Sequence, residues 1–184
     1  DASGTAECIA AVVAQMAGDN MGSVLKHFPG YGNNVDTHTG IAVDNRSLDQ
    51  FRENDFLPFS AGMEAGDGKA AVLVSHNIMT AVDDALPASL SPAVHDLLRT
   101  ELGFDGVVMT DDLAMDAVAT YAGDQSPAVM AVKAGNDMII TTDFQTQIPE
   151  VVQAVKSGEI DEAQIDQSVT RVLQWKYDLG LLGN

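Results

Sequence analysis

Four short apolar runs recur along the chain, and each is followed by polar residues. They occupy positions 23–28 (SVLKHF), 70–76 (AAVLVSH), 106–112 (GVVMTDD) and 137–143 (DMIITTD). The apolar residues in them are continuous rather than alternating, and Val and Ile are frequent. This pattern is typical of strands in a parallel sheet that is covered on both faces. We therefore predict four parallel strands.

Helical signals lie between these runs. The apolar positions before the first run have helical spacing, and Gly18 ends that segment. Ser91 and Ser126 each precede a Pro at the first position of a predicted helix, and Gly103 and Gly135 follow as stop signals. Helices are therefore expected to alternate with the strands.

The last helical segment carries signals of its own. Asp161 with Gln164 is typical of a capping box, and Ile160 with Ile165 has the spacing of a hydrophobic staple. Such a helix packs an apolar stripe against the rest of its domain. The residues expected in that stripe are Ile165, Val169, Val172 and Leu173.

The order of helices and strands predicts an α/β fold made of parallel βα units. No break in composition marks a linker, so we expect a single domain over residues 1–184. Four βα units are half of an eightfold barrel, and 184 residues fall short of the roughly 250 that such a barrel typically needs. The chain is therefore either a small open sheet or half of a larger structure.

Charge narrows the choice of partners. The chain has 27 Asp and Glu against 9 Lys and Arg, for a net charge of −18, which argues against nucleic acid or an anionic membrane surface as a partner. Cys8 is the single cysteine and excludes an intramolecular disulfide; we expect it in the core. There is no apolar run long enough for a membrane span. Because the sequence begins without Met, a targeting segment could precede it, and both cytoplasmic and secreted or cell-surface locations stay open.

Polar residues gather after the predicted strands, at Lys26 and His27, at His76, and at Asp111 and Asp112. Parallel α/β folds build their sites at the carboxyl ends of strands, so we expect these side chains near one another. A role in holding a ligand is favoured for Lys26, because Lys is rarely buried without a partner. For His76, a ligand contact and a hydrogen-bonded place in the core are equally compatible with the sequence.

The two carboxylates after the third strand are expected to differ in role. Neighbouring positions on a strand point to opposite faces, so one of the pair faces the site and the other turns aside. Asp111 could attack an electrophilic carbon, and Asp112 could cap the following helix.

A loop rich in Gly and Asn follows Pro29 and can bring Asp36 and His38 over the strand ends. An Asp-x-His pair is the minimum for proton transfer by an imidazole, although an ordinary hydrogen bond is the more common use of such a pair. The His and Asp residues lack a compact metal-ligand spacing, and neither GxGxxG nor a P-loop occurs, so no metal and no cofactor are expected.

Five segments taken together, KHFPGYG, DTH, ELGFDGVVMTDDLAM, KAGNDMIITT and VTRVLQWKYDLGLL, closely resemble glycoside hydrolase family 3. The resemblance covers essentially the whole chain, with the segments in order. It implies a TIM-like (β/α)8 barrel, of which this chain would supply the second half, about strands five to eight, and lack the N-terminal half. The DTH segment favours the bacterial β-N-acetylhexosaminidase branch.

The resemblance also implies a mechanism. The family consists of retaining exo-glycosidases that form a covalent glycosyl-enzyme intermediate, and this branch removes terminal β-linked N-acetylglucosamine. The implied roles are nucleophile for Asp111, acid/base for His38, orientation of His38 for Asp36, and sugar binding for Lys26, His27 and His76.

Several alternatives stay open. A family 3 β-glucosidase, a phosphorylase and an inactive sugar-binding fragment would share these features, and the substrate would be a carbohydrate such as a cell-wall fragment. Half a barrel leaves two sheet edges open, so we expect a second chain, either the missing half or another copy.

Overall fold

The computed structural model describes residues 1–32 and 41–183, so Asp36 and His38 lie outside the described residues. The described strands are β1 (Ser23–Phe28), β2 (Val43–Asp44), β3 (Ala70–Val74), β4 (Ile78–Met79) and β5 (Val108–Thr110). The described helices are α1 (Ala2–Gly18), α2 (Leu48–Glu53), α3 (Phe56–Ala65), α4 (Pro92–Asp96), α5 (Asp116–Ala122), α6 (Pro127–Ala134), α7 (Phe144–Ser157) and α8 (Glu162–Asp178), with a 3₁₀ turn η2 (Ala88–Leu90) and a π-helical turn η3 (Leu97–Glu101).

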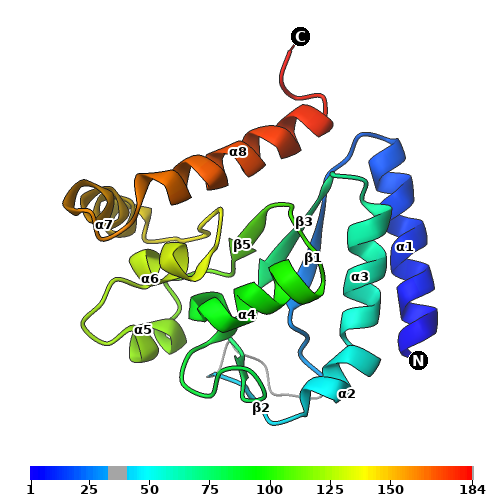
Figure 1. Cartoon of the computed structure of the whole chain (residues 1–184), viewed down its shortest axis with the longest axis horizontal. Coiled ribbons are helices and arrows are strands. Elements are labelled where there is room, and N and C mark those ends of the chain that lie inside the picture. Colours follow the sequence, from blue (N-terminus) through cyan, green and yellow to red (C-terminus); the bar gives the residue numbers. More distant parts are fainter. Residues whose placement is uncertain (33–40, 184) are drawn as a thin grey trace.

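The central sheet has three parallel strands in the order β1-β3-β5, which confirms an α/β fold with parallel strands (Figure 1). Strands β2 and β4 form a separate parallel pair. The fourth predicted strand is reduced to one parallel bridge between Met109 and Met138. The ladder does not continue because the N–H of Ile140 donates to the Thr110 side chain, 3.0 Å away, instead of to a backbone carbonyl.

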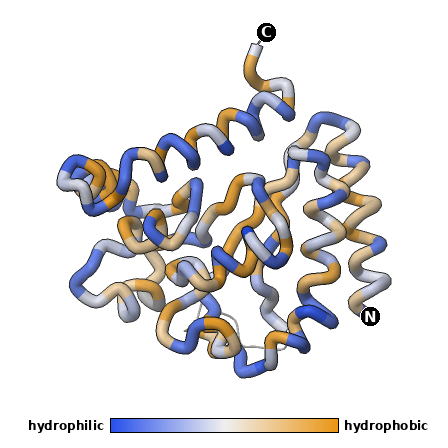
Figure 2. Tube along the Cα trace, viewed as in Figure 1, coloured by the Kyte–Doolittle hydropathy of each residue, from blue (hydrophilic) through white to orange (hydrophobic). Residues whose placement is uncertain are grey.

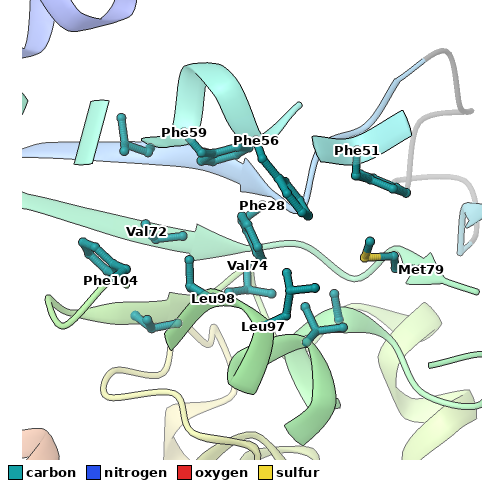
Figure 3. Packing of buried hydrophobic residues seen from close by; sticks show 14 of the residues in the cluster. Phe28, Phe51, Phe56, Phe59, Val72, Val74, Met79, Leu97, Leu98 and Phe104 are labelled. Atoms are coloured by element: carbon teal, nitrogen blue, oxygen red, sulfur yellow. The ribbon is translucent and has the colours of Figure 1, made fainter. Parts of the chain in front are cut away.

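One core lies between the strands and the helices that follow β1 and β3 (Figure 3). Phe28 of β1 is fully buried, stacks on Phe56 with ring centroids 5.8 Å apart, and meets Phe59 edge-to-face at 5.2 Å. Val72 and Val74 of β3 pack into the same cluster. Burial of these aromatic rings stabilises the packing of α3 on the sheet, because each ring covers a large apolar area.

The strand residues between those of the first cluster, whose side chains point to the other face of the sheet, form a second cluster with α8. Ala71, Leu73, Val107 and Met109 are buried there, and Val172 and Trp175 of α8 pack against them. Helix α8 runs along the side of the molecule where the strands begin, and the Trp175 indole donates to the backbone carbonyl of Lys69 at 3.0 Å (Figure 1). Figure 2 shows the apolar residues concentrated in the central strands, whereas apolar and polar residues alternate along α8.

The predicted stripe of α8 is only partly right. Ile165 and Val172 pack against clusters, but Val169 and Leu173 are 49% and 47% exposed, because α8 contacts the described residues along one side only. Cys8 is exposed as well, so its predicted core position is wrong.

Most predicted helix boundaries are confirmed, with one exception. Ser91 and Ser126 cap α4 and α6, accepting hydrogen bonds from backbone N–H groups three residues later. Asp161 caps α8, but Gln164 bonds to the carbonyl of Val132 instead of completing a capping box. Tertiary contact with α6 therefore takes the Gln164 side chain away from the helix terminus. Within the described ranges, no helix is long and apolar enough to cross a membrane.

Candidate functional site

Asp111 follows β5, the strand that ends the three-stranded sheet. Its backbone N–H donates to the carbonyl of Val74 at 3.1 Å, which fixes the residue at the carboxyl end of the sheet. The N–H of Asp112 donates to Oδ1 of Asp111 at 2.9 Å. The other oxygen, Oδ2, lies 3.9 Å from Nε2 of His27, and both side chains are about a third exposed. One carboxylate oxygen is thus held by the backbone and the other faces an accessible space beside His27.

His27 and Lys26 come from the end of β1, where the Lys26–His27 and Phe28–Pro29 peptide bonds are both cis. The His27 ring meets the ring of Tyr31 edge-to-face at 5.2 Å. The structure therefore brings His27 together with Asp111, as the sequence predicted. Lys26 is exposed and lines an apolar groove of about 280 Å³ beside α1 and α3. No contact joins Lys26 to Asp111 among the described residues.

Asp112 turns away from Asp111 and stabilises the backbone around the site. Its Oδ1 accepts hydrogen bonds from the N–H groups of Ala114, at 2.9 Å, and Thr142, at 3.0 Å. Burial acts to raise the pKa of the Asp112 carboxyl, but these hydrogen bonds outweigh it and lower that pKa below the ordinary value. Asp112 therefore caps a turn and not helix α5, whose first residue is Asp116.

His76 lies just past β3 and is 1% exposed. Its Nδ1 is 2.7 Å from the Ser89 hydroxyl and its Nε2 is 3.0 Å from the backbone carbonyl of Asp112. A carbonyl only accepts, so this network assigns the proton to Nε2 and makes Nδ1 the acceptor for Ser89. Burial lowers the pKa of the ring, which keeps it neutral near pH 7. Both nitrogens of His76 are thus bonded to protein groups, as in the core alternative that the sequence left open.

A second polar cluster, which the sequence reasoning missed, lies beside Gly30 and Gly32, which follow β1. Arg46 donates from Nε and Nη2 to the Asp44 carboxylate at 2.8–3.1 Å, and from Nη1 to Asp55 at 2.6 Å. Its guanidinium also lies over the Phe51 ring, 4.3 Å from the centroid. Hydrogen bonds to Asp44, the largest of several effects, raise the pKa of Arg46 above its already high value. The sequence feature that could have revealed this cluster is the close spacing of Asp44 and Arg46, just after the loop of Asp36 and His38.

Asp44, Arg46 and Asp55 border a cavity of about 750 Å³ that is open to solvent and lies between α1, α2 and β2. Gly32 also lines it. In the part of the chain that the structure describes, no group of three or more His, Cys, Asp or Glu side chains could hold a metal ion. The arrangement that offers chemistry is therefore a carboxylate with one free oxygen, faced by an imidazole, at the end of a parallel sheet.

Comparison with known proteins assigns the class. Residues 1–175 match the family described as glycosyl hydrolase family 3 N terminal domain. Because this match covers most of the chain, the chain belongs to glycoside hydrolase family 3, and the resemblance seen in the sequence is confirmed at the level of the family.

Several individual proteins are similar to this chain. A beta-hexosaminidase of Stenotrophomonas maltophilia (strain K279a) is 37% identical over 158 residues, which are 85% of this chain and 46% of that protein. Among solved structures, a glycoside hydrolase family 3 beta-N-acetylglucosaminidase from Paenibacillus sp. str. FPU-7 is similar with a TM-score of 0.85 and 33% identity, over 95% of this chain and 34% of that chain. The beta-N-acetylglucosaminidase from Thermotoga maritima has a TM-score of 0.75 at 27% identity, over 89% of this chain and 36% of that chain. The chain spans about half the length of the curated relatives it matches.

Proposed function

We propose that the protein is a retaining β-N-acetylhexosaminidase that releases terminal β-linked N-acetylglucosamine through a covalent glycosyl-enzyme intermediate. The observation that carries this proposal is the position of Asp111, at the carboxyl end of β5 with Oδ2 beside His27 and the side chain about a third exposed. Membership of glycoside hydrolase family 3 and the similarity to proteins named as hexosaminidases support the substrate class.

In the first step, Oδ2 of Asp111 attacks the anomeric carbon while His38 protonates the departing glycosidic oxygen. In the second step, His38 takes a proton from water, and that water displaces Asp111 from the sugar. An imidazole suits both steps, because its unperturbed pKa of about 6.5 lets it give and take a proton near neutrality. Asp36 orients the ring. Asp36 and His38 lie outside the described residues, so their roles rest on the sequence pattern.

Sugar binding falls to residues around Asp111. His27 is 3.9 Å from the Asp111 carboxylate and is partly exposed, so its ring can reach hydroxyl groups of a sugar bound at the nucleophile. Lys26 is exposed but lines the groove beside α1 and α3, so its assignment to sugar binding rests on the sequence pattern. His76 was expected to bind sugar too, but its buried ring would have to break a hydrogen bond to do so.

We further propose that the chain forms the second half of a TIM-like barrel, about strands five to eight. The three strands of its central sheet, β1, β3 and β5, follow the chain order, and helices separate them along the chain. Among the described residues, β1 pairs with β3 along one edge only, and Val24 on β1 is 40% exposed. At the opposite edge Met138 and Ile140 are 37% and 39% exposed. The other half of the barrel, in the same polypeptide, in a separate chain or in a second copy, would cover both edges.

The test uses the complete protein with chromogenic β-glycosides. We expect release from the N-acetyl-β-glucosaminide at a rate at least tenfold above release from the β-glucoside, and we expect Asp111→Asn to lower kcat by a factor of about 10³ or more, because the nucleophile is lost. Asp112→Asn keeps an oxygen that can accept from Ala114 and Thr142, and is the matched control, with a much smaller loss. Normal turnover by Asp111→Asn would overturn the mechanism, and a preference for the glucoside or for phosphate as acceptor would overturn the substrate or the reaction type.

A further inference from the structure

The backbone at Asp112 determines how the Asp111 carboxylate lies. The N–H of Asp112 holds Oδ1 of Asp111 at 2.9 Å, so any rotation of the peptide between the two residues turns the carboxylate with it. Asp112 itself is bonded on both sides. Its carboxylate binds the N–H groups of Ala114 and Thr142, and its carbonyl accepts from His76 at 3.0 Å and from the N–H of Met115 at 3.3 Å.

His76 is well placed to act as the fixed end of this arrangement. The ring is buried, and Ser89 donates to its Nδ1 at 2.7 Å. Ser89 is fully buried too: its N–H donates to the carbonyl of Ser75 at 3.0 Å, and its carbonyl accepts from the Asn136 side chain at 2.8 Å. A chain of buried hydrogen bonds therefore runs from Asn136 through Ser89 and His76 to the backbone of Asp112.

We propose that His76 is a positioning residue for the nucleophile, which acts through the Asp112 backbone to keep Oδ2 of Asp111 aimed at the substrate. The proposal rests on the assignment of Asp111 as nucleophile. It gives His76 a role different from sugar binding. It also assigns the two oxygens of Asp111: Oδ1 is the anchored oxygen, and Oδ2 is the one that forms the bond to the sugar.

The rate of the reaction depends on the position of the attacking oxygen. Reaction requires the attacking oxygen close to the anomeric carbon and aligned with the departing bond, and a displacement of about 1 Å can cost about a hundredfold in rate. Loss of the His76 hydrogen bond leaves the partly buried Asp112 carbonyl with the longer bond from the Met115 N–H, so the backbone of Asp112, whose own N–H holds Oδ1 of Asp111, can shift. Substrate still binds, because the hydroxyl groups of the sugar contact other residues.

The decisive variants are His76→Leu and His76→Gln in the complete protein. Leu removes the hydrogen bond, whereas Gln can carry an N–H donor to about the position of Nε2. We expect His76→Leu to lower kcat about a hundredfold with KM within about twofold, and His76→Gln to recover a large part of that loss. Calorimetric titration with N-acetylglucosamine should give the same Kd within about twofold for the wild type and both variants.

His95 is the matched control. It is another buried histidine, 3% exposed, and its Nδ1 lies 2.9 Å from the carbonyl of Ser91; its ring packs against Gly135 and meets the Asn136 side chain, at the far end of the buried hydrogen-bond chain, and contacts neither Asp111 nor Asp112. His95→Leu should lower the thermal midpoint about as much as His76→Leu and leave kcat within about twofold of the wild type. The comparison separates positioning from a general loss of stability.

Two outcomes would overturn the proposal. If His76→Leu weakens binding of N-acetylglucosamine about tenfold or more, His76 contacts the sugar. If kcat falls equally in His95→Leu, or does not fall in His76→Leu, the histidine has a structural role only. Should His76→Leu fail to fold, Ser89→Ala removes only the outer hydrogen bond and must still lower kcat, by about tenfold, at unchanged Kd. Normal turnover in Asp111→Asn would instead show that the proposed function itself is wrong.

Discussion

Asp137 offers a sharp test of how this domain is held together at the ends where its strands begin. Its side chain is fully buried, and it binds Arg99 at 2.7 Å and Arg171 at 3.2 Å. It also accepts from the N–H of Val108 and the hydroxyl of Ser168, so one carboxylate joins η3, β5 and α8. Asp137→Asn preserves the shape and can keep the bond from Val108, but it removes the charge that both guanidinium groups face.

The magnitude follows from burial. Breaking a buried ion pair costs about 3–5 kcal/mol, and the low end applies here because Arg99 and Arg171 keep 19% and 27% of their side-chain surface exposed to solvent. A loss of about 3 kcal/mol with an m-value of about 2 kcal/mol/M lowers the urea midpoint by about 1.5 M. Circular dichroism of the complete protein in urea measures this shift.

Asp105 supplies the control on the same partner. It lies 3.3 Å from Arg171 but is 92% exposed, so Asp105→Asn should cost less than about 1 kcal/mol, a shift below about 0.5 M. If the midpoints of Asp137→Asn and Asp105→Asn differ by less than about 0.5 M, the reasoning from burial is refuted.

Two further predictions concern pH and backbone conformation. Burial lowers the pKa of His76 and His95 below the ordinary 6.5, so below pH 6.5 the unfolded chain binds protons that the folded chain does not. As the pH falls from 6.5 toward the lower pKa values of the folded state, the free energy of unfolding should therefore fall by about 1.4 kcal/mol per pH unit for each ring. Thermal midpoints between pH 7 and 5 measure the slope, and an unchanged slope in His95→Gln would contradict the assignment. Gly30 has φ of +123° and an added Cβ would lie 2.1 Å from Asp55, whereas Gly158 has φ of +78° and open space around it. Gly30→Ala should therefore be less stable than Gly158→Ala by about 1 kcal/mol or more in urea unfolding, and equal losses would show that Asp55 moves aside freely.

Sequence patterns predicted those strands and helix ends that depend on neighbouring residues in the chain. The run SVLKHF matches β1 residue for residue, and the Ser-Pro pairs mark the first turns of α4 and α6. Helix α2 escaped notice although its capping box, Ser47 with Gln50, is legible in the sequence, because no long apolar stripe follows it. The exposed side of α8 and the single bridge at Met138 could not be predicted, since both depend on which segments pack beside them.

The sequence predicted which residues lie at the candidate site, but not the hydrogen bonds that each of them makes. Strand ends placed Asp111 and His27 together, but Asp112 caps a turn instead of the following helix that the sequence favoured. For His76 the sequence left two roles open, because a histidine at a strand end looks the same whether it faces a ligand or a buried serine. Ser89, which decides between them, lies in a short turn that no motif marks.

Arg46 shows how the described residues constrain both ends of segment 33–40. Before that segment, an added Cβ on Gly32 would lie 2.8 Å from the Arg46 guanidinium, so the backbone passes directly against it. After the segment, Asp44 binds the same guanidinium through both carboxylate oxygens. Asp55 completes the cluster from the turn before α3, and its carboxylate packs against Gly30. One arginine therefore contacts the described chain before segment 33–40, at Gly32, and after it, at Asp44, whereas the hydrogen bonds of His76 lie beside Asp111. The Arg46 cluster and the hydrogen bonds of His76 have no residue in common, so we expect the effects of substitutions in one cluster to add to those of substitutions in the other.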